Sequence, residues 1–462
     1  MLKRIIIFNL LTVGLVSMAL AQHNLTMYNM HTLPQRIQVN PSAVPDSRFF
    51  ISMPGLASVH FLYGNDGFKL KNAVTVDDSN RLVVHPTSFY NSLNKNNIIS
   101  LNTDYDIINF GFKLRKSYIT MSLGEKIKNQ VSFPKDFFGL FIVGNAGDNL
   151  GKDMNFNFGF DVMAYNDISA TYSRAFLKDK LRLGVKGSYL NGILNINTER
   201  SDLIFNTNAE DFHYTVRTDI KVNTSSIMDT LNGNFEGDNF DYNVLKSRNR
   251  GMAVGIGATY QLLPKIILSA SIIDLGFINW KDNVQNYETA DKDKKVEYYG
   301  LKMNDFFSDN PNTDSSFKAI LDTLTTKLKL KNTYKGYRTN LPASFYLGGN
   351  FWLTKRHNFG VLFFGNYYQK KLNPAITLSY NGKLTRIFGI SVSYSMINKS
   401  FVNGGVGFTL NGGPFQYYVV ADNVLGMIRY KNANTVDIRT GINFTFLRKD
   451  KQSGLSGKSK KL

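Results

Sequence analysis

The chain has 462 residues, of which 43% are hydrophobic and 13% are aromatic, whereas only 19% are charged. This aromatic content excludes a disordered chain, and the mean hydropathy of −0.20 excludes a bundle of membrane helices. The sequence contains no cysteine, which excludes disulfides, thiolate metal sites, cysteine nucleophiles and a lipoprotein anchor. Few charges, many aromatic residues and 37 glycines indicate a fold that places apolar side chains sparingly but at regular intervals.

The first 21 residues have the organisation of an export signal. Lys3 and Arg4 precede an apolar stretch over 5–20, and Ala19-Leu20-Ala21 matches a signal-peptidase site. The alternative is a transmembrane anchor, which the short apolar stretch and the small residues directly after it disfavour. No later stretch reaches about 18 uninterrupted apolar residues. We therefore expect a signal peptide over 1–21 and an exported chain that does not cross a membrane with helices.

Residues 22–46 do not alternate in polarity, yet they are too apolar for a free tail. They include Met27, Tyr28 and Leu33, followed by Asn40 and Pro41. If the remainder of the chain forms a wide barrel, the lumen of that barrel needs filling. We expect residues 22–46 to fold into the lumen as a plug or hatch, with Asn40 and Pro41 fixing its turn.

Residues 47–447 show repeated alternation between apolar and polar side chains. In the clearest case, alternate positions from Val436 to Phe446 are apolar or Thr, and the positions between them are polar or Gly. A period of two is typical of strands with one apolar face. The pattern predicts fourteen strands, near 49–63, 104–115, 117–131, 158–176, 181–198, 251–262, 265–281, 335–353, 356–371, 374–383, 386–396, 400–410, 413–421 and 435–447.

Two features favour a membrane barrel over a soluble sandwich. Most of the runs span about 10 or more residues, the length of a tilted membrane strand, whereas soluble strands average about 5–6. Short turns also alternate with long polar connections, as in outer-membrane barrels. The long connections are 64–103, 132–157, 199–250 and 282–334. We predict an all-β fold, a transmembrane antiparallel barrel of about fourteen strands in the outer membrane of a Gram-negative bacterium.

An even number of strands places both termini on one side of the membrane, with the short turns in the periplasm. The last strand ends in an aromatic residue and is followed by a basic tail, 448–462, which we expect to lie in the periplasm. This last strand is similar to the C-terminal signal read by the barrel-assembly machinery, although the tail departs from that pattern. Segment 200–224 alternates weakly and predicts a hairpin above the membrane.

Two predicted external loops carry apolar side chains that need covering. Residues 133–143 predict a short helix or packed turn, and residues 315–330 have an apolar stripe at helical spacing. The two segments either cover each other and cap the barrel, or they form a surface that captures a ligand or a partner. The candidate residues are Phe137, Phe138, Leu140, Phe141, Phe317, Leu321 and Leu324.

The net charge of +19 does not indicate nucleic-acid binding. The signal contributes +2 and the tail +5, which leaves +12 over the body of the chain. Nucleic-acid binding needs a basic stripe interleaved with aromatic residues, whereas these basic residues occupy turns, loops and lumen-facing positions. The predicted lumen residues Lys113, Arg182, Lys186 and Arg439 either make the interior cationic or pair with acids such as Asp104, Asp161 and Asp437.

Catalytic motifs are absent from the sequence. The six histidines are scattered, and there is no nucleophile elbow, P-loop or dinucleotide fingerprint. A triad assembled from separate strands would leave no trace in the spacing, and a calcium site in the loops has no EF-hand pattern to support it. We expect no enzyme activity, no catalytic residues, no metal and no cofactor.

Several motifs carry a resemblance to a known group. They are Met27-Tyr28-Asn29-Met30, Leu33-Pro34-Gln35-Arg36, Asn40-Pro41, Met53-Pro54-Gly55-Leu56 and Phe133-Pro134-Lys135-Asp136. With the strand pattern and the apolar loops, they resemble the long-chain fatty-acid transporter (FadL) superfamily and, within it, an uncharacterised family of Bacteroidota outer-membrane barrels. The resemblance implies uptake of hydrophobic molecules through a hatch-gated barrel with lateral exit through the wall. The type IX secretion component PorV resembles this barrel architecture, and a likeness to it would imply an assembly or shuttle role.

Two functional hypotheses follow from the sequence. In the first, the barrel lies in outer-membrane lipid and admits a small hydrophobic or amphipathic molecule past the hatch. In the second, it is a subunit of a secretion, motility or envelope-assembly complex, and its apolar loops bind protein. A general porin is a weaker alternative because a plug closes the channel.

Overall fold

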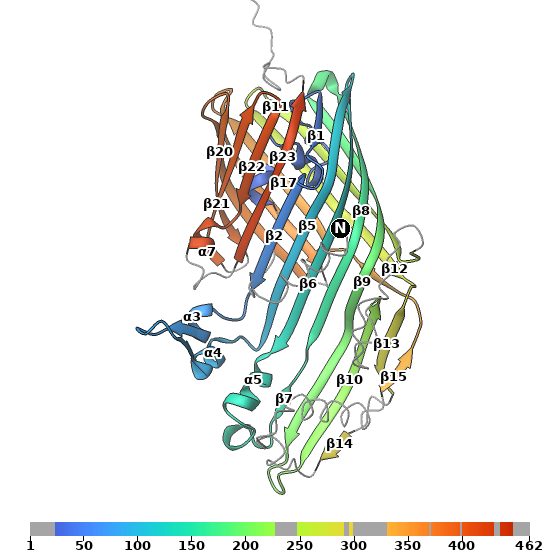
Figure 1. The fold of residues 1–462 in the computed structure, drawn as a ribbon, viewed down its shortest axis with the longest axis vertical. Coiled ribbons are helices and arrows are strands. Elements are labelled where there is room, and N and C mark those ends of the chain that lie inside the picture. The colour runs from blue at the N-terminus through green and yellow to red at the C-terminus, as the bar shows by residue number, and fades with distance from the viewer. Residues whose placement is uncertain are drawn as a thin grey trace, which may run out of the picture.

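The strands of the computed structural model form one antiparallel wall that closes on itself (Figure 1). The structure describes residues 24–226, 247–290, 295–298, 330–368, 371–397, 400–428 and 435–446. The wall is a closed barrel of 14 strands, and Phe49 at its start pairs with Phe446 at its end. The predicted fold class is therefore confirmed. No helix among the described residues is long and apolar enough to cross a membrane.

The wall strands follow the chain order. They are β1 (Phe49–Ser52) continued by β2 (Ser58–Asn65), β5 (Asn96–Leu114), β6 (Ser117–Pro134), β8 (Gly159–Phe176), β9 (Leu181–Thr207), β11 (Arg250–Leu263), β12 (Ile266–Trp280), β16 (Tyr337–Asn340) continued by β17 (Ala343–Trp352), β18 (His357–Tyr368), β19 (Lys371–Lys383), β20 (Phe388–Ile397), β21 (Ser400–Gly412), β22 (Phe415–Ala421) and β23 (Thr435–Phe446).

Alternation along these strands separates an apolar exterior from a polar interior. On β8, for example, Ile168 and Tyr172 are exposed, whereas Asp167, Ser169 and Thr171 are buried toward the lumen. Such an exterior is stable only against lipid, and the interior is the reverse of a soluble core. The hydrophobic residues of the composition therefore cover the outside of the wall.

The first wall strand is interrupted, whereas the sequence predicts one strand over 49–63. Residues 53–57 separate β1 from β2, and both pieces pair with β5 and β23. Pro54 lacks the N–H that a ladder requires, and Gly55 adopts a positive φ of 80°. Met53 and Leu56 project from this interruption and are exposed. The wall is therefore interrupted between β1 and β2.

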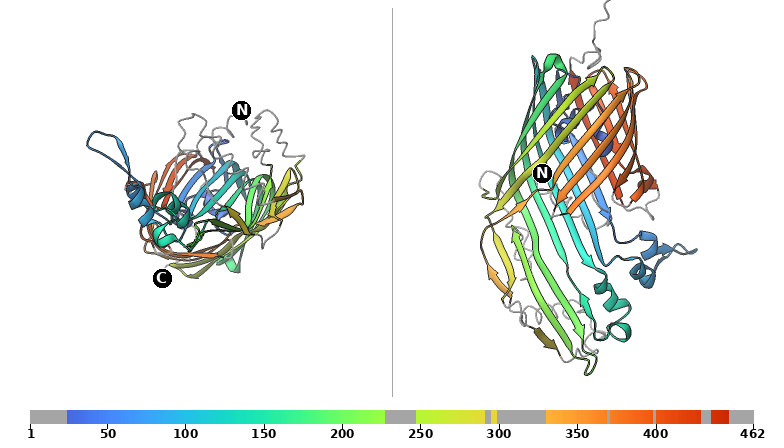
Figure 2. Two further views of the ribbon diagram at one scale, coloured as in Figure 1. Left: turned by 90° about the horizontal axis from the view of Figure 1, so that it is seen from below. Right: turned by 180° about the vertical axis from the view of Figure 1, so that it is seen from behind.

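One side of the barrel stands taller than the other (Figures 1 and 2). The outer half of β9 continues past the barrel and pairs with β7 (Asp153–Asn155) and β10 (Tyr214–Ser225). β10 pairs in turn with β13 (Val284–Thr289) and β14 (Lys295–Tyr298), and β13 pairs with β15 (Leu330–Thr333). The strands around 200–224 match the predicted hairpin, whereas the connections 199–250 and 282–334, expected as loops, also contain strands.

Several short helices and a short hairpin lie at the end of the barrel where β9 and β10 extend. They are α3 (Leu70–Ala73), the hairpin β3 (Val74–Val76) and β4 (Leu82–Val84), α4 (Pro86–Ser92), α5 (Lys135–Ile142), η2 (Gly147–Asn149) and α7 (Val424–Ile428). The predicted helix or packed turn over 133–143 corresponds to α5. The opposite end has tight turns, among them η3 (Leu177–Asp179) between β8 and β9. By analogy with outer-membrane barrels, we call the tight-turn end periplasmic and the other end external.

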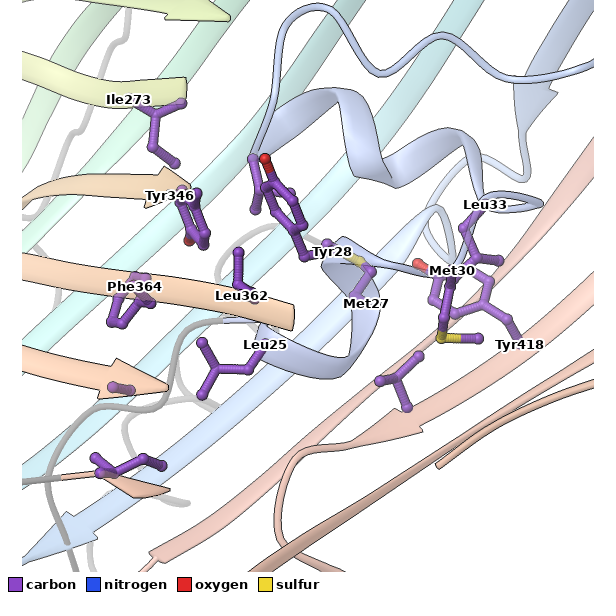
Figure 3. Close-up of a cluster of buried hydrophobic side chains, with 14 residues drawn as sticks. Leu25, Met27, Tyr28, Met30, Leu33, Ile273, Tyr346, Leu362, Phe364 and Tyr418 are labelled. Atoms are coloured by element: carbon purple, nitrogen blue, oxygen red, sulfur yellow. The ribbon is translucent and has the colours of Figure 1, made fainter. Parts of the chain in front are cut away.

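The segment 24–48 lies inside the barrel and contains α2 (Leu25–Tyr28) and η1 (Pro34–Gln38). Leu25, Met27 and Leu33 are almost fully buried against wall residues such as Leu362 and Tyr418 (Figure 3). We call residues 24–48 the inner segment. Together with the wall residues that they contact, its apolar side chains form an extended hydrophobic cluster inside the barrel.

Candidate functional site

A cavity of about 120 Å³ lies between the inner segment and the external ends of the shorter strands. Asn24, Gln38 and Val39 of the inner segment contribute to its floor, and Tyr368 and Asn373 lie at its outer edge. Its side walls carry charged residues from six strands, namely Asp104, Asp106, Lys126, Lys128, Asp161, Asp167, Lys186, Asp274 and Arg439. The cavity is therefore a polar chamber above the inner segment.

The strand period places these charges in the lumen. Lys126 and Lys128 are two residues apart on β6, and Lys126 is directly opposite Asp104 of β5. Side chains at such spacing point to the same face of a strand. Asp274 reaches the cavity differently, because β12 has a bulge there and Asp274 adopts a positive φ of 59°. Ile273 and Asp274 consequently both line the chamber.

Two lysines and two aspartates form a quartet across four strands. Lys126 Nζ lies 3.0 Å from Asp167 Oδ2, and Lys186 Nζ lies 3.6 Å from the same oxygen. Asp274 Oδ1 lies 4.0 Å from Lys126 Nζ and 3.9 Å from Lys186 Nζ. The quartet is neutral overall, and Asp167 and Lys186 are buried. The sequence left two interpretations of the lumen cations, and for Lys186 the structure shows pairing with acids.

A second network joins the wall to the inner segment. Asp104 Oδ2 lies 3.3 Å from Arg439 Nη2 and 3.2 Å from His60 Nδ1, while its other oxygen accepts from Lys128. His60 Nε2 contacts Asp437 at 2.9 Å. Arg439 Nε then donates to the Asn24 side chain at 2.8 Å. The ion pairs of four strands, β2, β5, β6 and β23, therefore reach the start of the inner segment.

Backbone and amide contacts hold the inner segment elsewhere. Both oxygens of the buried Asp422 accept hydrogen bonds, at 2.8 Å each, from the backbone N–H groups of Leu25 and Thr26. Gln35 exchanges two hydrogen bonds with Asn443 of β23, at 2.7 and 3.0 Å. Asp422 directly follows β22, and Asn443 lies on β23. The C-terminal strands therefore hold the inner segment at these two points.

Asn40 and Pro41, the predicted hatch residues, lie against the wall. Asn40 Oδ1 accepts hydrogen bonds from the backbone N–H and hydroxyl of Ser42, which closes a turn. An added Cβ at Gly184 of β9 would lie 2.2 Å from the Pro41 carbonyl oxygen. The turn therefore docks where the wall has no side chain.

The predicted capture residues Phe137, Phe138 and Phe141 lie together on α5. They belong to a chain of ring contacts that we call the outer aromatic cluster: Phe68, Phe89, Phe133, Phe137, Phe138, Phe141, Phe156, Phe158, Phe160, Phe205 and Tyr214. Phe141 is 65% exposed and Leu140 is half-buried. Phe317, Leu321 and Leu324 lie outside the described residues.

This cluster begins on the outer face of the wall rather than in the lumen. Phe133 follows Lys128 by five residues on β6, and an odd spacing reverses the face of a strand. Phe133 follows Gln130, which lines the chamber, by only three positions. The apolar surface and the polar chamber are therefore neighbours across the external rim of β6.

Most of the chamber is not predicted from the sequence. His60 is one of six scattered histidines there, and no motif marks Lys126, Lys128, Asp167 or Asp274. Charged residues at alternate positions of neighbouring predicted strands, as in 104–106 and 126–128, could have revealed it. Among the described residues, no group of three His, Cys, Asp or Glu side chains is placed to hold a metal ion.

Several solved structures have a similar course of the chain. A deletion mutant of the monoaromatic hydrocarbon channel TodX is 9% identical with a TM-score of 0.44, covering 94% of this chain and 96% of its own. The toluene transporter TodX of P. putida is 8% identical with a TM-score of 0.43, over 90% and 94%. A Pseudomonas aeruginosa FadL homologue is 8% identical with a TM-score of 0.41, over 93% and 100%.

Among curated proteins, none matches this chain. A family model does match, over residues 41–422, which is most of the barrel. The chain therefore belongs to the DUF5723 family, a family of unknown function.

Proposed function

We propose that this protein is an outer-membrane channel that admits a small amphipathic molecule from outside the cell. The observation that carries the proposal is the position of the outer aromatic cluster beside the polar chamber, on two faces of one rim. The cluster offers exposed rings for an apolar tail, as Phe141 does. The chamber offers charged and amide groups for a polar head.

The inner segment would act as the hatch of this channel. It forms the floor of the chamber, and its apolar side chains fill the lumen below. Passage requires this segment to move, or requires an exit through the wall. The interruption at 53–57 favours a lateral exit, because its base touches the hatch: Gln35 Nε2 donates to the Ala57 carbonyl at 3.3 Å.

The test is uptake of a labelled alkyl amphiphile by cells that carry the protein. Replacing Phe138 and Phe141 by Ser removes two rings of the cluster, and we expect uptake to fall at least about tenfold. Phe212→Ser is the matched control, because Phe212 is similarly exposed (61%) but makes none of the ring contacts of the cluster. Uptake by the double variant equal to that of the control would refute the proposal. Co-purification of a protein partner in stoichiometric amount would instead favour the hypothesis that this barrel is a subunit of an envelope complex.

A further inference from the structure

One carboxylate oxygen in the chamber has no hydrogen-bond partner among the described residues. Asp167 is 5% exposed, and its Oδ2 is engaged by Lys126 and Lys186. Its Oδ1 is buried and unpaired, although Asp167 lines the chamber. A buried acceptor without a partner has lost its hydration and gained no hydrogen bond in return, so this oxygen is a specific feature that needs a partner.

The groups around this oxygen select the charge of that partner. Each lysine ammonium has three N–H donors, and those of Lys126 and Lys186 lie next to the unpaired acceptor. An anion would meet the carboxylates of Asp167 and Asp274, whereas a cation would meet the two ammonium groups. A hydroxyl satisfies both kinds of group at once, because it accepts from an ammonium and donates to a carboxylate. The neutral quartet therefore favours an uncharged ligand with several hydroxyls.

The rest of the chamber suits a ring. Tyr165, Tyr346 and Tyr368 line it, together with the amides of Gln38 and Asn366. Aromatic side chains pack against the C–H faces of a sugar ring, while amides and charged groups bind its hydroxyls. A volume of about 120 Å³ holds on the order of ten water-sized groups, which is the scale of one hexose rather than an oligosaccharide.

We infer that the chamber binds a single uncharged sugar ring. This inference rests on the proposed function, in which the chamber takes the polar head of an amphipathic molecule, and it names that head as a sugar. The sugar has two possible sources, a glycoside with an apolar tail or a free hexose. Asp167 and the two lysines would bind its hydroxyls, and Tyr165 and Tyr368 would pack against its ring.

The experiment is calorimetric titration of the full chain in lipid nanodiscs, free of sugar-based detergent. The probes are octyl glucoside below its micellar concentration, glucose, and octanoate as a tail without a sugar. We expect octyl glucoside to bind more tightly than glucose, and octanoate to bind at least tenfold more weakly than octyl glucoside. Asp167→Asn should weaken both sugar probes at least tenfold, whereas Asp179→Asn, in a periplasmic turn, should not.

A second variant guards against local misfolding at the quartet. Ser100→Phe fills the chamber from β5 without changing a charge and should abolish binding of both sugar probes. Glucose binding as tightly as octyl glucoside would support the sugar site but refute an amphipathic ligand. Octanoate binding as tightly as octyl glucoside, insensitive to Asp167→Asn, would overturn the sugar inference and leave the proposed function intact. No binding of either sugar probe would also overturn it.

Discussion

Replacing Gly184 by Ala should dislodge the hatch turn from the wall. The new Cβ would lie 2.2 Å from the Pro41 carbonyl oxygen and 2.7 Å from the Ser42 amide nitrogen. Both neighbours are backbone atoms, so the turn cannot yield by rotating a side chain. Overpacking of this kind costs about 1–3 kcal/mol, which corresponds to a roughly 5- to 150-fold increase in the population of the displaced turn.

The measurement is amide hydrogen exchange of the protein in nanodiscs, compared peptide by peptide. Exchange over 36–44 should accelerate by that factor, while the amides of β11 and β12 stay protected. Gly187→Ala on the same strand is the matched control, because nothing lies within 4 Å of its added Cβ. Equal exchange in the two variants would refute the docking of the turn. Faster exchange throughout the wall would show that the substitution destabilises the barrel instead.

Two further predictions concern the hatch. Asp422→Asn presents an amide donor to the backbone N–H groups of Leu25 and Thr26, so at least one charge-assisted hydrogen bond is lost, worth about 1.5–3 kcal/mol. Exchange at 25–30 should rise at least about tenfold, and no change would mean that Asp422 does not anchor the segment. Because the chain lacks cysteine, Ser42→Cys with Thr259→Cys, whose hydroxyl oxygens lie 2.7 Å apart, should form a disulfide that fixes the hatch. Oxidised protein should lose amphiphile uptake and recover it on reduction; uptake that ignores the redox state would mean that this turn does not move.

The wall could be predicted from the sequence because lipid and lumen impose opposite polarity on successive residues. This rule holds wherever a strand crosses the membrane, so strands such as 436–446 are unmistakable. It does not hold above the membrane, where both faces of β10 and β13 meet water or protein. The sequence therefore predicts the strand over 214–225 only weakly, and it predicts a loop where β13 forms over 284–289.

The candidate site was harder to predict because it depends on register between strands. The quartet joins side chains from β6, β8, β9 and β12, and no single strand reveals it. The bulge that turns Asp274 inward is also invisible in the alternation of 265–281. The aromatic cluster lies on the outer face because Phe133 is an odd number of positions from the lumen-facing Lys128. The sequence predicts this face only if β6 continues to Pro134.

The contacts between the two ends of the chain constrain the order of assembly. Leu25 and Thr26 bind Asp422, almost 400 residues later, and Gln35 binds Asn443. The strand that directly follows the inner segment, β1, is also the one that meets β23 at the seam. The start of the inner segment therefore lacks its Asp422 anchor until β22 has been synthesised, and closure of the barrel positions the segment beside the seam. Maturation of the lumen and sealing of the wall are thus one late step, governed by the slowest long-range contacts of the chain.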